Sequence, residues 1–369
     1  MSLSRRSSLA LIGGGVVVAA AIPAAAFLAT RTPDSALAPW DKAGRYSDPR
    51  MRALSYALLA PNPHNRQPWL AELVGSDGVT LYRDLKRTLP VTDPLSRQLT
   101  IGMGCFLELM EMAAAQEGYG VTTTLFPIGE NGPTAICRFM PGVGKPDPLF
   151  AHALNRRTHK GPFEARAVPS DAVKRLSAHA QIFTDGPEQS ALRRLAHAGW
   201  MREVRTPDAW QESIDLLRIG KAEINANPDG IPLSGPMIET MAMVGMLTRN
   251  AAANPESPSA KPFIERTANA ILQAPAFTVS VSQQNGRADQ IAAGRRWLRL
   301  NLAATAEGLA LRPVSQSLQE YPAMKTIYDE IHARLAPRGE TVQMLGVMGY
   351  GAATPRTPRW PLESRMRNA

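Results

Sequence analysis

The sequence predicts an α+β protein made of two related halves in one chain. The first observation is a match without gaps between Gly104–Gly118 and Gly294–Gly308, in which both glycines, an Ala pair and a Glu coincide. The second is that each matched segment follows a β-type stretch and precedes another extended one, so a strand–helix–strand order recurs. We therefore expect long helices to pack the halves together, each half with a mixed sheet. Chance similarity between two Ala-rich helices is the competing explanation.

Three elements are expected in the first half, residues 48–150. Pro49–Ala60 is a short helix that ends at Pro61. Val79–Tyr82 is a strand. Arg97–Gln116 is a buried helix, because apolar residues lie on all of its faces and glycines follow it directly.

The second half, residues 151–369, carries more sequence than the first. Its predicted strands are Phe277–Ser282 and Thr341–Met348. A Pro- and Met-rich stretch at 225–261 is longer than an ordinary connection, so a lid-like insertion, an arm or a disordered loop is expected there. The tryptophans predicted to be core residues are Trp200, Trp210 and Trp297.

Residues 1–30 have the features of an export signal. Arg5 and Arg6 precede an uncharged stretch, Leu9–Thr30, with small residues near its end. The arginine pair resembles a twin-arginine signal, which predicts export to the periplasm by that route, with the export machinery as a partner. The alternative is a membrane anchor through residues 9–30, since this stretch is nearly long enough to span a bilayer. Residues 31–47 are expected to be a linker.

The composition is that of a globular protein, with 44% hydrophobic and 20% charged residues. The net charge of +9 fits either a solvated basic surface or an anionic ligand. No long basic run is interleaved with aromatic residues, so nucleic acid is not an expected partner. The two cysteines and six histidines lack metal-ligand spacing, and no metal site is predicted.

A short basic segment carries Arg156, Thr158 and Lys160. Alternate residues of an extended segment point to one side, so this stretch would present a guanidinium, a hydroxyl and an ammonium together. Such a set suits a phosphate and a second electron-rich group on the same ligand. A solvated basic face is the alternative. His159 lies one step out of phase and is expected to be exposed to solvent.

Four stretches of the chain resemble the flavin nitroreductases. PNPHNRQPW (61–69) is similar to their Pro-Ser-x-x-Asn-x-Gln-Pro-Trp loop, and RRTHKGPF (156–163) to their opening Arg-x-Ser/Thr-x-Arg/Lys segment. LNLAATAEGLALRPVSQ (300–316) resembles their buried helix and the turn after it. GVMGYGAATPRTPRWPLE (346–363) resembles their closing strand and arginine-bearing tail. Together with the twin-arginine leader, the pattern most resembles the Acg-type branch of these nitroreductase-like FMN proteins.

This resemblance implies an FMN site in the cleft between the halves. It implies that Arg156, Thr158 and Lys160 hold the phosphate and the pyrimidine edge of the flavin. It assigns Pro61, Asn62 and Pro63 to packing on the flavin ring, and Asn65 and Gln67 either to holding that loop or to contacting the ring. Arg359, or alternatively Arg356, would add a second phosphate contact. Ser315 and Gln316 would lie near the flavin N5. Asn62 stands where the family usually has Ser, so the loop departs from the pattern there. No catalytic side chain is predicted, because hydride transfer needs no protein nucleophile or acid–base pair.

Each half lacks the motif that the other retains, since no basic segment precedes the 61–69 loop and no second NxQPW follows residue 163. The resemblance therefore implies a monomeric pseudo-dimer with a single FMN site, in place of the usual two-subunit dimer. The expected function is FMN-dependent reduction of small electron-poor acceptors, such as nitro compounds or quinones. NAD(P)H or another molecule would be the electron donor. The alternative is a protein that sequesters or stores FMN beneath the 225–261 insertion.

Overall fold

The computed structural model describes residues 31–367, and the predicted export signal or anchor at 1–30 lies outside the described residues. The helices are α2 (Asp34–Lys42), α3 (Pro49–Ala57), α4 (Arg97–Gln116), α5 (Ser170–Leu176), α6 (Gly186–Arg205), α7 (Pro207–Asp215), α8 (Gly220–Ala226), α9 (Pro236–Met243), α10 (Arg249–Ala253), α11 (Lys261–Leu272), α12 (Arg287–Ala306) and α13 (Lys325–Leu335). The strands are β1 (Trp69–Val74), β2 (Gly78–Arg83), β3 (Tyr119–Leu125), β4 (Ala135–Pro141), β5 (Gln181–Phe183), β6 (Leu217–Ile219), β7 (Ile231–Leu233), β8 (Ala276–Ser282), β9 (Ala310–Pro313) and β10 (Thr341–Gly349). Short 3-10 turns are η1 (Pro63–Asn65), η2 (Pro148–His152), η3 (Ser315–Leu318), η4 (Pro322–Met324) and η5 (Leu362–Arg365).

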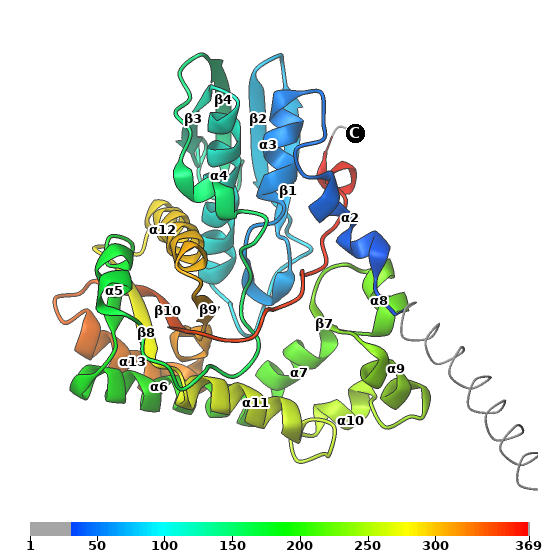
Figure 1. Ribbon diagram of the computed structural model, residues 1–369, viewed down its shortest axis with the longest axis vertical. Coiled ribbons are helices and arrows are strands. Elements are labelled where there is room, and N and C mark those ends of the chain that lie inside the picture. The colour runs from blue at the N-terminus through cyan, green and yellow to red at the C-terminus, as the bar shows by residue number, and fades with distance from the viewer. Residues whose placement is uncertain (1–30, 368–369) are drawn as a thin grey trace, which may run out of the picture.

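Two four-stranded sheets form the framework of this α+β fold (Figure 1), with strand orders β1-β2-β4-β3 and β5-β8-β10-β9. The two strand orders correspond. In the first sheet α4 leads from the inner strand β2 to the edge strand β3, and β4 then lies between them. In the second sheet α12 leads from β8 to β9, and β10 lies between them. The two strands joined by the helix are thereby separated, and every neighbouring pair in these sheets is antiparallel. The expectation of a mixed sheet in each half is wrong for this reason. β6 and β7 form a separate parallel pair.

Helices α4 and α12 cross at a pair of glycines. A Cβ atom on Gly294 would lie 2.0 Å from the carbonyl oxygen of Ile101 and 2.9 Å from the Cα of Gly104. A Cβ on Gly104 would lie 2.2 Å from the carbonyl oxygen of Ile291. Only glycine allows the two backbones to approach this closely. Gly104 and Gly294 are also the first residues of the two matched sequence segments.

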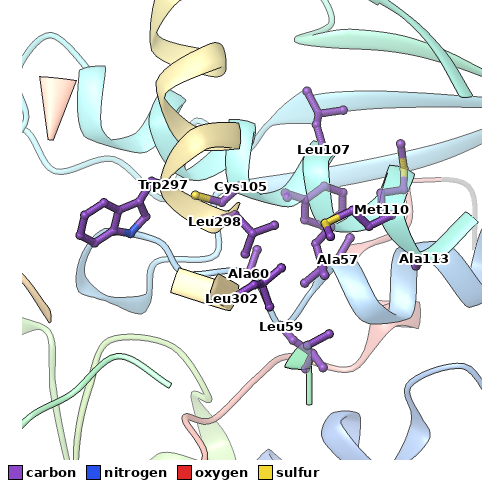
Figure 2. Close-up of a cluster of buried hydrophobic side chains, with 14 of the residues drawn as sticks. Ala57, Leu59, Ala60, Cys105, Leu107, Met110, Ala113, Trp297, Leu298 and Leu302 are labelled. Carbon is purple, nitrogen blue, oxygen red and sulfur yellow. The ribbon is translucent and has the colours of Figure 1, made fainter. Parts of the chain in front are cut away.

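The apolar core of the first half extends across this crossing. Figure 2 shows buried side chains from three segments packed together. The segments are helix α4, helix α12, and the end of α3 with the residues that follow it. Leu59, Leu298 and Leu302 are inaccessible to solvent. Each fully buried Leu stabilises the fold by about 2 kcal/mol. Buried residues of both sheets belong to this one cluster, so the sheets are joined through a continuous core rather than through a hinge.

The predicted elements are found with small differences in their bounds. The helix Arg97–Gln116 has the predicted ends, whereas α3 stops at Ala57, and Leu59 and Ala60 follow in a tight turn. The expected linker at 31–47 contains helix α2, whose Trp40 is buried. The 225–261 stretch contains β7, α9 and α10. Between residues 31 and 367, no helix has the length and apolar character needed to cross a membrane.

Candidate functional site

A cavity of about 270 Å³ lies where the two halves meet. It is bounded by the loop after α3, one end of α4, the 156–160 segment, helices α6 and α7, and the turn after β9. Ten of the predicted site residues are in its wall: Pro61, Asn62, Pro63, Asn65, Arg156, Thr158, Lys160, Ser315, Gln316 and Arg359. Gln67 and Arg356 are not among the wall residues. Residues distant in the sequence are thus brought together in the wall of one cavity.

The basic segment lies along the edge of β9, with the N–H of His159 donating to the carbonyl of Leu311 at 2.9 Å. Arg156, Thr158 and Lys160 all line the cavity. Arg157 lies outside the cavity wall and places its guanidinium 4.5 Å from the ring centre of Trp40. The alternation expected of an extended segment therefore selects which side chains reach the cavity.

The expectation that His159 is exposed is wrong, because the residue is only 3% exposed. The other side of the segment is covered by the C-terminal tail. The ring lies 4.8 Å from that of Phe163, and its nitrogens contact the carbonyl of Pro162 and the hydroxyl of Thr354. A Cβ on Gly351 would lie 2.7 Å from the imidazole. His159 fixes the segment against the tail instead of facing solvent.

Four cations gather at this end of the cavity: Arg156, Lys160, Arg312 and Arg359. Within residues 31–367 none of them has a carboxylate partner. Burial, followed by the charges of Arg157 and Arg266 respectively, lowers the pKa of Arg156 and of Arg312 to about 10. Burial, followed by the charges of Arg312 and Arg359, lowers that of Lys160 to about 8. Lys160 is accessible to solvent within the cavity, but the surrounding protein still disfavours its charge. Such uncompensated charge is costly unless an anion is present.

Arg156 is the least satisfied of the four. Its Nη2 donates to the carbonyl of Leu59 at 3.0 Å, while its Nε and Nη1 are buried without a partner among the described residues. Among the described residues, Arg312 donates one hydrogen bond, from Nη2 to the hydroxyl of Thr267 at 3.2 Å. A buried guanidinium with unused N–H groups is costly unless a ligand accepts from it. These donors point to an oxygen-rich anionic ligand.

Arg359 lies in the cavity wall but its donors are already used. Its guanidinium donates to the carbonyls of Leu58, Leu59, Ala60 and Pro358 and to the side chain of Asn65, at distances from 2.6 to 3.1 Å. These bonds engage all five N–H groups of an arginine. Burial, followed by the charges of neighbouring arginines, lowers its pKa to about 9. Arg359 thus holds the loop after α3 to the C-terminal tail.

The loop at 61–67 is held in a strained conformation. His64, Asn65 and Gln67 have φ values of 47°, 52° and 50°, a region that non-glycine residues rarely adopt. The side chain of Asn62 accepts from the N–H of Gln67 at 2.7 Å. Gln67 donates to the carbonyl of Pro228 at 2.6 Å and accepts from the N–H of Trp360 at 2.9 Å. Asn65 and Gln67 therefore hold the loop, one of the two roles expected for them.

Two other residues were singled out from the sequence: Arg356 lies away from the cavity, and Trp297 lies in its apolar wall. Arg356 forms an exposed ion pair with Asp41 at 2.6 Å, outside the cavity. Trp297 is buried, as predicted, and also lines the cavity beside Met344 and Cys105. Burial raises the pKa of the Cys105 thiol to about 12, so this sulfur is a neutral part of the wall.

Sequence reasoning missed another part of the cavity wall. Glu203 of α6 lies there with Trp200, Trp210 and Phe263, which contact one another at ring-centre distances of 5.9 to 6.4 Å. Burial raises the pKa of Glu203 to about 7. Arg312 was also missed. The signal for Arg312 is an arginine inside a short apolar strand, and the signal for Glu203 is its spacing from Trp200, Trp-x-x-Glu, within a helix.

No protein-family model matches the chain, and no curated protein matches it. Several solved structures are similar. The FMN and NADPH-dependent nitroreductase NfnB from Sphigopyxis sp. strain HMH is 14% identical, and the similarity covers 59% of this chain and 97% of that chain with a TM-score of 0.36. The FMN-dependent nitroreductase NfnB from Mycobacterium smegmatis, solved in complex with NADPH, is 18% identical over 57% of this chain and 92% of that chain, with a TM-score of 0.33. A nitroreductase with bound FMN from Desulfitobacterium hafniense DCB-2 is 15% identical over 56% of this chain and 90% of that chain, with a TM-score of 0.32.

Proposed function

We propose that this protein is an FMN-binding, nitroreductase-like oxidoreductase. The observation that carries the proposal is the cationic end of the cavity, where Arg156, Lys160 and Arg312 lack carboxylate partners. Two buried N–H groups of Arg156 have no acceptor among residues 31–367. FMN carries a phosphate of nearly two negative charges and ring carbonyls that accept hydrogen bonds.

The residues present fit this cofactor. Arg156, Thr158 and Lys160 would hold the phosphate and the pyrimidine edge, with Arg312 as a further cation. The apolar wall, which includes Ile101 and Trp297, suits a flat ring system. FMN, when bound, would supply hydride transfer between a donor and an acceptor. A cation beside the ring makes electron acceptance more favourable, because it stabilises negative charge on the reduced ring.

We further propose that the chain is an Acg-type, internally duplicated pseudo-dimer with a single flavin site. The equal strand order of the two sheets supports this, as does the crossing of α4 and α12 at Gly104 and Gly294. The loop at 61–67 comes from one half and the basic segment at 156–160 from the other. The cavity combines one copy of each.

Small electron-poor acceptors, such as nitro compounds and quinones, are the proposed substrates, with NAD(P)H as the electron donor. The solved neighbours named above include one in complex with NADPH. Export through the twin-arginine signal at 1–30, or anchoring through residues 9–30, remains part of the proposal. An exported enzyme would meet another donor, since soluble NAD(P)H is a cytoplasmic molecule.

Storage of FMN is the second proposal. The observation that favours it is the wall formed by Gly230, Ile231 and Pro232, part of the 225–261 stretch. Gln67 and Arg66 tie this stretch to the loop after α3, through the carbonyl of Pro228 and the carboxylate of Asp229. A wall fixed in this way would restrict access to the ring.

The visible spectrum of the purified full chain tests these proposals. A yellow protein with one FMN per chain that bleaches with NADPH without oxygen and recovers with a nitroaromatic is an oxidoreductase. A yellow protein that does not respond favours storage, and a protein that takes up no FMN rules out both.

Two variants locate the site. Arg156→Met is expected to weaken FMN binding by about tenfold or more, since a charged hydrogen bond contributes about 1.5–3 kcal/mol. Arg157→Met is the matched control, because it removes the same charge from the adjacent residue, outside the cavity wall. Equal loss in both variants would show that general charge, and not this cavity, holds the flavin.

A further inference from the structure

The cavity wall also contains three buried polar side chains that the flavin proposal does not use. Glu203, Ser213 and Gln319 are 2%, 7% and 3% exposed, and all three line the cavity. They come from α6, α7 and the residue that follows η3. Buried polar groups are costly unless something binds to them.

These groups stand beside an aromatic wall because of helical spacing. Glu203 follows Trp200 by three residues on α6, and Ser213 follows Trp210 by three residues on α7. Side chains three apart lie on one face of a helix. Phe263 at the start of α11 completes the wall and is 40% exposed, so an aromatic face is accessible there. The result is an apolar surface of three rings inclined to one another by 40° to 77°, with polar groups beside it.

The unused hydrogen-bonding capacity of these polar groups is mainly that of acceptors. The Nε2 of Gln319 donates to Oε2 of Glu203 at 2.6 Å, which leaves Oε1 of Gln319 buried without a partner among the described residues. The hydroxyl of Ser213 is also buried without a partner there. A carboxyl oxygen, an amide oxygen and a hydroxyl together accept hydrogen bonds from a donor-rich group.

We propose that this part of the cavity is a second ligand subsite, which binds a planar aromatic molecule carrying N–H donors, such as an aromatic amidine or carboxamide. The ring lies against Trp210 and Phe263, and the N–H groups donate to Glu203 and Gln319. The subsite depends on the proposed function in one respect: it would hold the second reactant next to the flavin. Its ligand preference follows from its own residues.

The charge in this part of the cavity favours such a ligand over an anion. Among the described residues, the charged group that acts on Glu203 is the carboxylate of Glu212, which supplies no positive charge. Within residues 31–367, no arginine or lysine of the cavity wall contributes to the pKa shift of Glu203. A cationic or neutral N–H donor is therefore attracted where a carboxylate is repelled.

Calorimetric titration of the full chain with benzamidine and acetophenone tests the subsite. Both probes have a benzene ring of the same size, but only benzamidine carries N–H donors. At pH 8 benzamidine is expected to bind at least about tenfold more tightly, since a charge-assisted hydrogen bond contributes about 1.5–3 kcal/mol. Equal affinity of the two probes would overturn the proposal.

Variants identify the residues involved. Glu203→Gln is expected to weaken benzamidine binding by about tenfold and to leave acetophenone unchanged. Glu188→Gln removes a carboxylate from the same helix at a half-exposed position and is the matched control. If Glu203→Gln does not fold, Ser213→Ala and Phe263→Ala each test the subsite, and unchanged benzamidine affinity in both would overturn it.

The flavin content of each sample, read from its absorbance, separates this proposal from the function proposed above. Benzamidine binding to a protein that takes up no FMN would support the subsite and refute the flavin proposal. FMN binding without any preference for benzamidine would do the reverse. Titration in inorganic phosphate checks that benzamidine does not compete for the cationic end, because the two should bind together.

Discussion

Gly104 and Gly294 meet where α4 crosses α12, with only 2.9 Å between the Cα of Gly104 and the position that a Cβ on Gly294 would take. The two glycines also occupy the same position in the two matched sequence segments. Corresponding points of two helices therefore touch, as they do on the axis of a two-fold dimer. This contact supports the proposed duplication.

Gly294→Ala is expected to destabilise the protein, although alanine ordinarily stabilises the interior of a helix by about 1 kcal/mol relative to glycine. The added methyl would meet the carbonyl oxygen of Ile101 at 2.0 Å. Overpacking of this kind costs about 1–3 kcal/mol, which urea unfolding measures. Gly102→Ala is a graded control, because its nearest atom is a side-chain carbon of Asn62 at 3.1 Å, and a smaller loss is expected. A Gly294→Ala protein as stable as the parent would contradict the tight crossing.

Lys160→Met is expected to change stability and binding in opposite directions. The pKa of Lys160 is lowered from 10.5 to about 8, so its charge opposes folding at pH 7, and this penalty disappears as the pH rises from about 8 to 10.5. The ligand-free variant should therefore melt at a higher temperature at pH 7, while FMN affinity falls. Thermal scans with and without FMN measure both. A lower melting temperature for the ligand-free variant would show that Lys160 stabilises the empty cavity.

Arg359→Lys is expected to destabilise the fold despite keeping the charge. Lysine has three N–H donors where arginine uses five, so buried carbonyls at the end of α3 lose their partners. Each lost partner costs about 1–3 kcal/mol. Arg356→Lys on the same tail affects only an exposed ion pair with Asp41 and should change the free energy of unfolding by less than about 1 kcal/mol. Urea unfolding of the two variants compares them, and equal stability would refute the role of Arg359.

Glu203→Gln is expected to alter how stability depends on pH. The pKa of Glu203 is raised from 4.5 to about 7, so between these values the folded protein keeps a proton that the unfolded chain has lost. Stability of the parent should fall across this interval by roughly 3 kcal/mol through this group alone. The variant lacks this loss, so its advantage over the parent should be larger at pH 8 than at pH 4. Parallel stability profiles would mean that Glu203 titrates normally.

The sequence predicted the parts of the fold that local patterns control. Helix α4 has the predicted ends because its apolar faces and the glycines after it act locally. Arg156, Thr158 and Lys160 were predicted to share a side because an extended segment alternates, and all three line the cavity. The loop at 61–67 was found through a motif whose residues are consecutive.

The remaining features depend on contacts between distant segments, which the local pattern does not contain. His159 is buried because the tail near Gly351 covers it, and Glu203 reaches the cavity because α6 packs against η3. The mixed sheet was wrongly expected because a returning strand, β4 or β10, separates the two strands that each long helix connects. Arg359 was predicted to contact phosphate, but its position at the end of α3 directs its donors to carbonyl groups.

The bond from Arg359 to the carbonyl of Leu58 also sets an order of events during synthesis, because it joins residues 301 apart. At about 5–20 residues per second, a ribosome needs roughly 15–60 s to make the chain between them. During that time α3 and the 61–67 loop exist without the group that holds them. A nascent chain therefore has no complete cavity, and binding of the proposed flavin must wait until the tail has been made and has folded back.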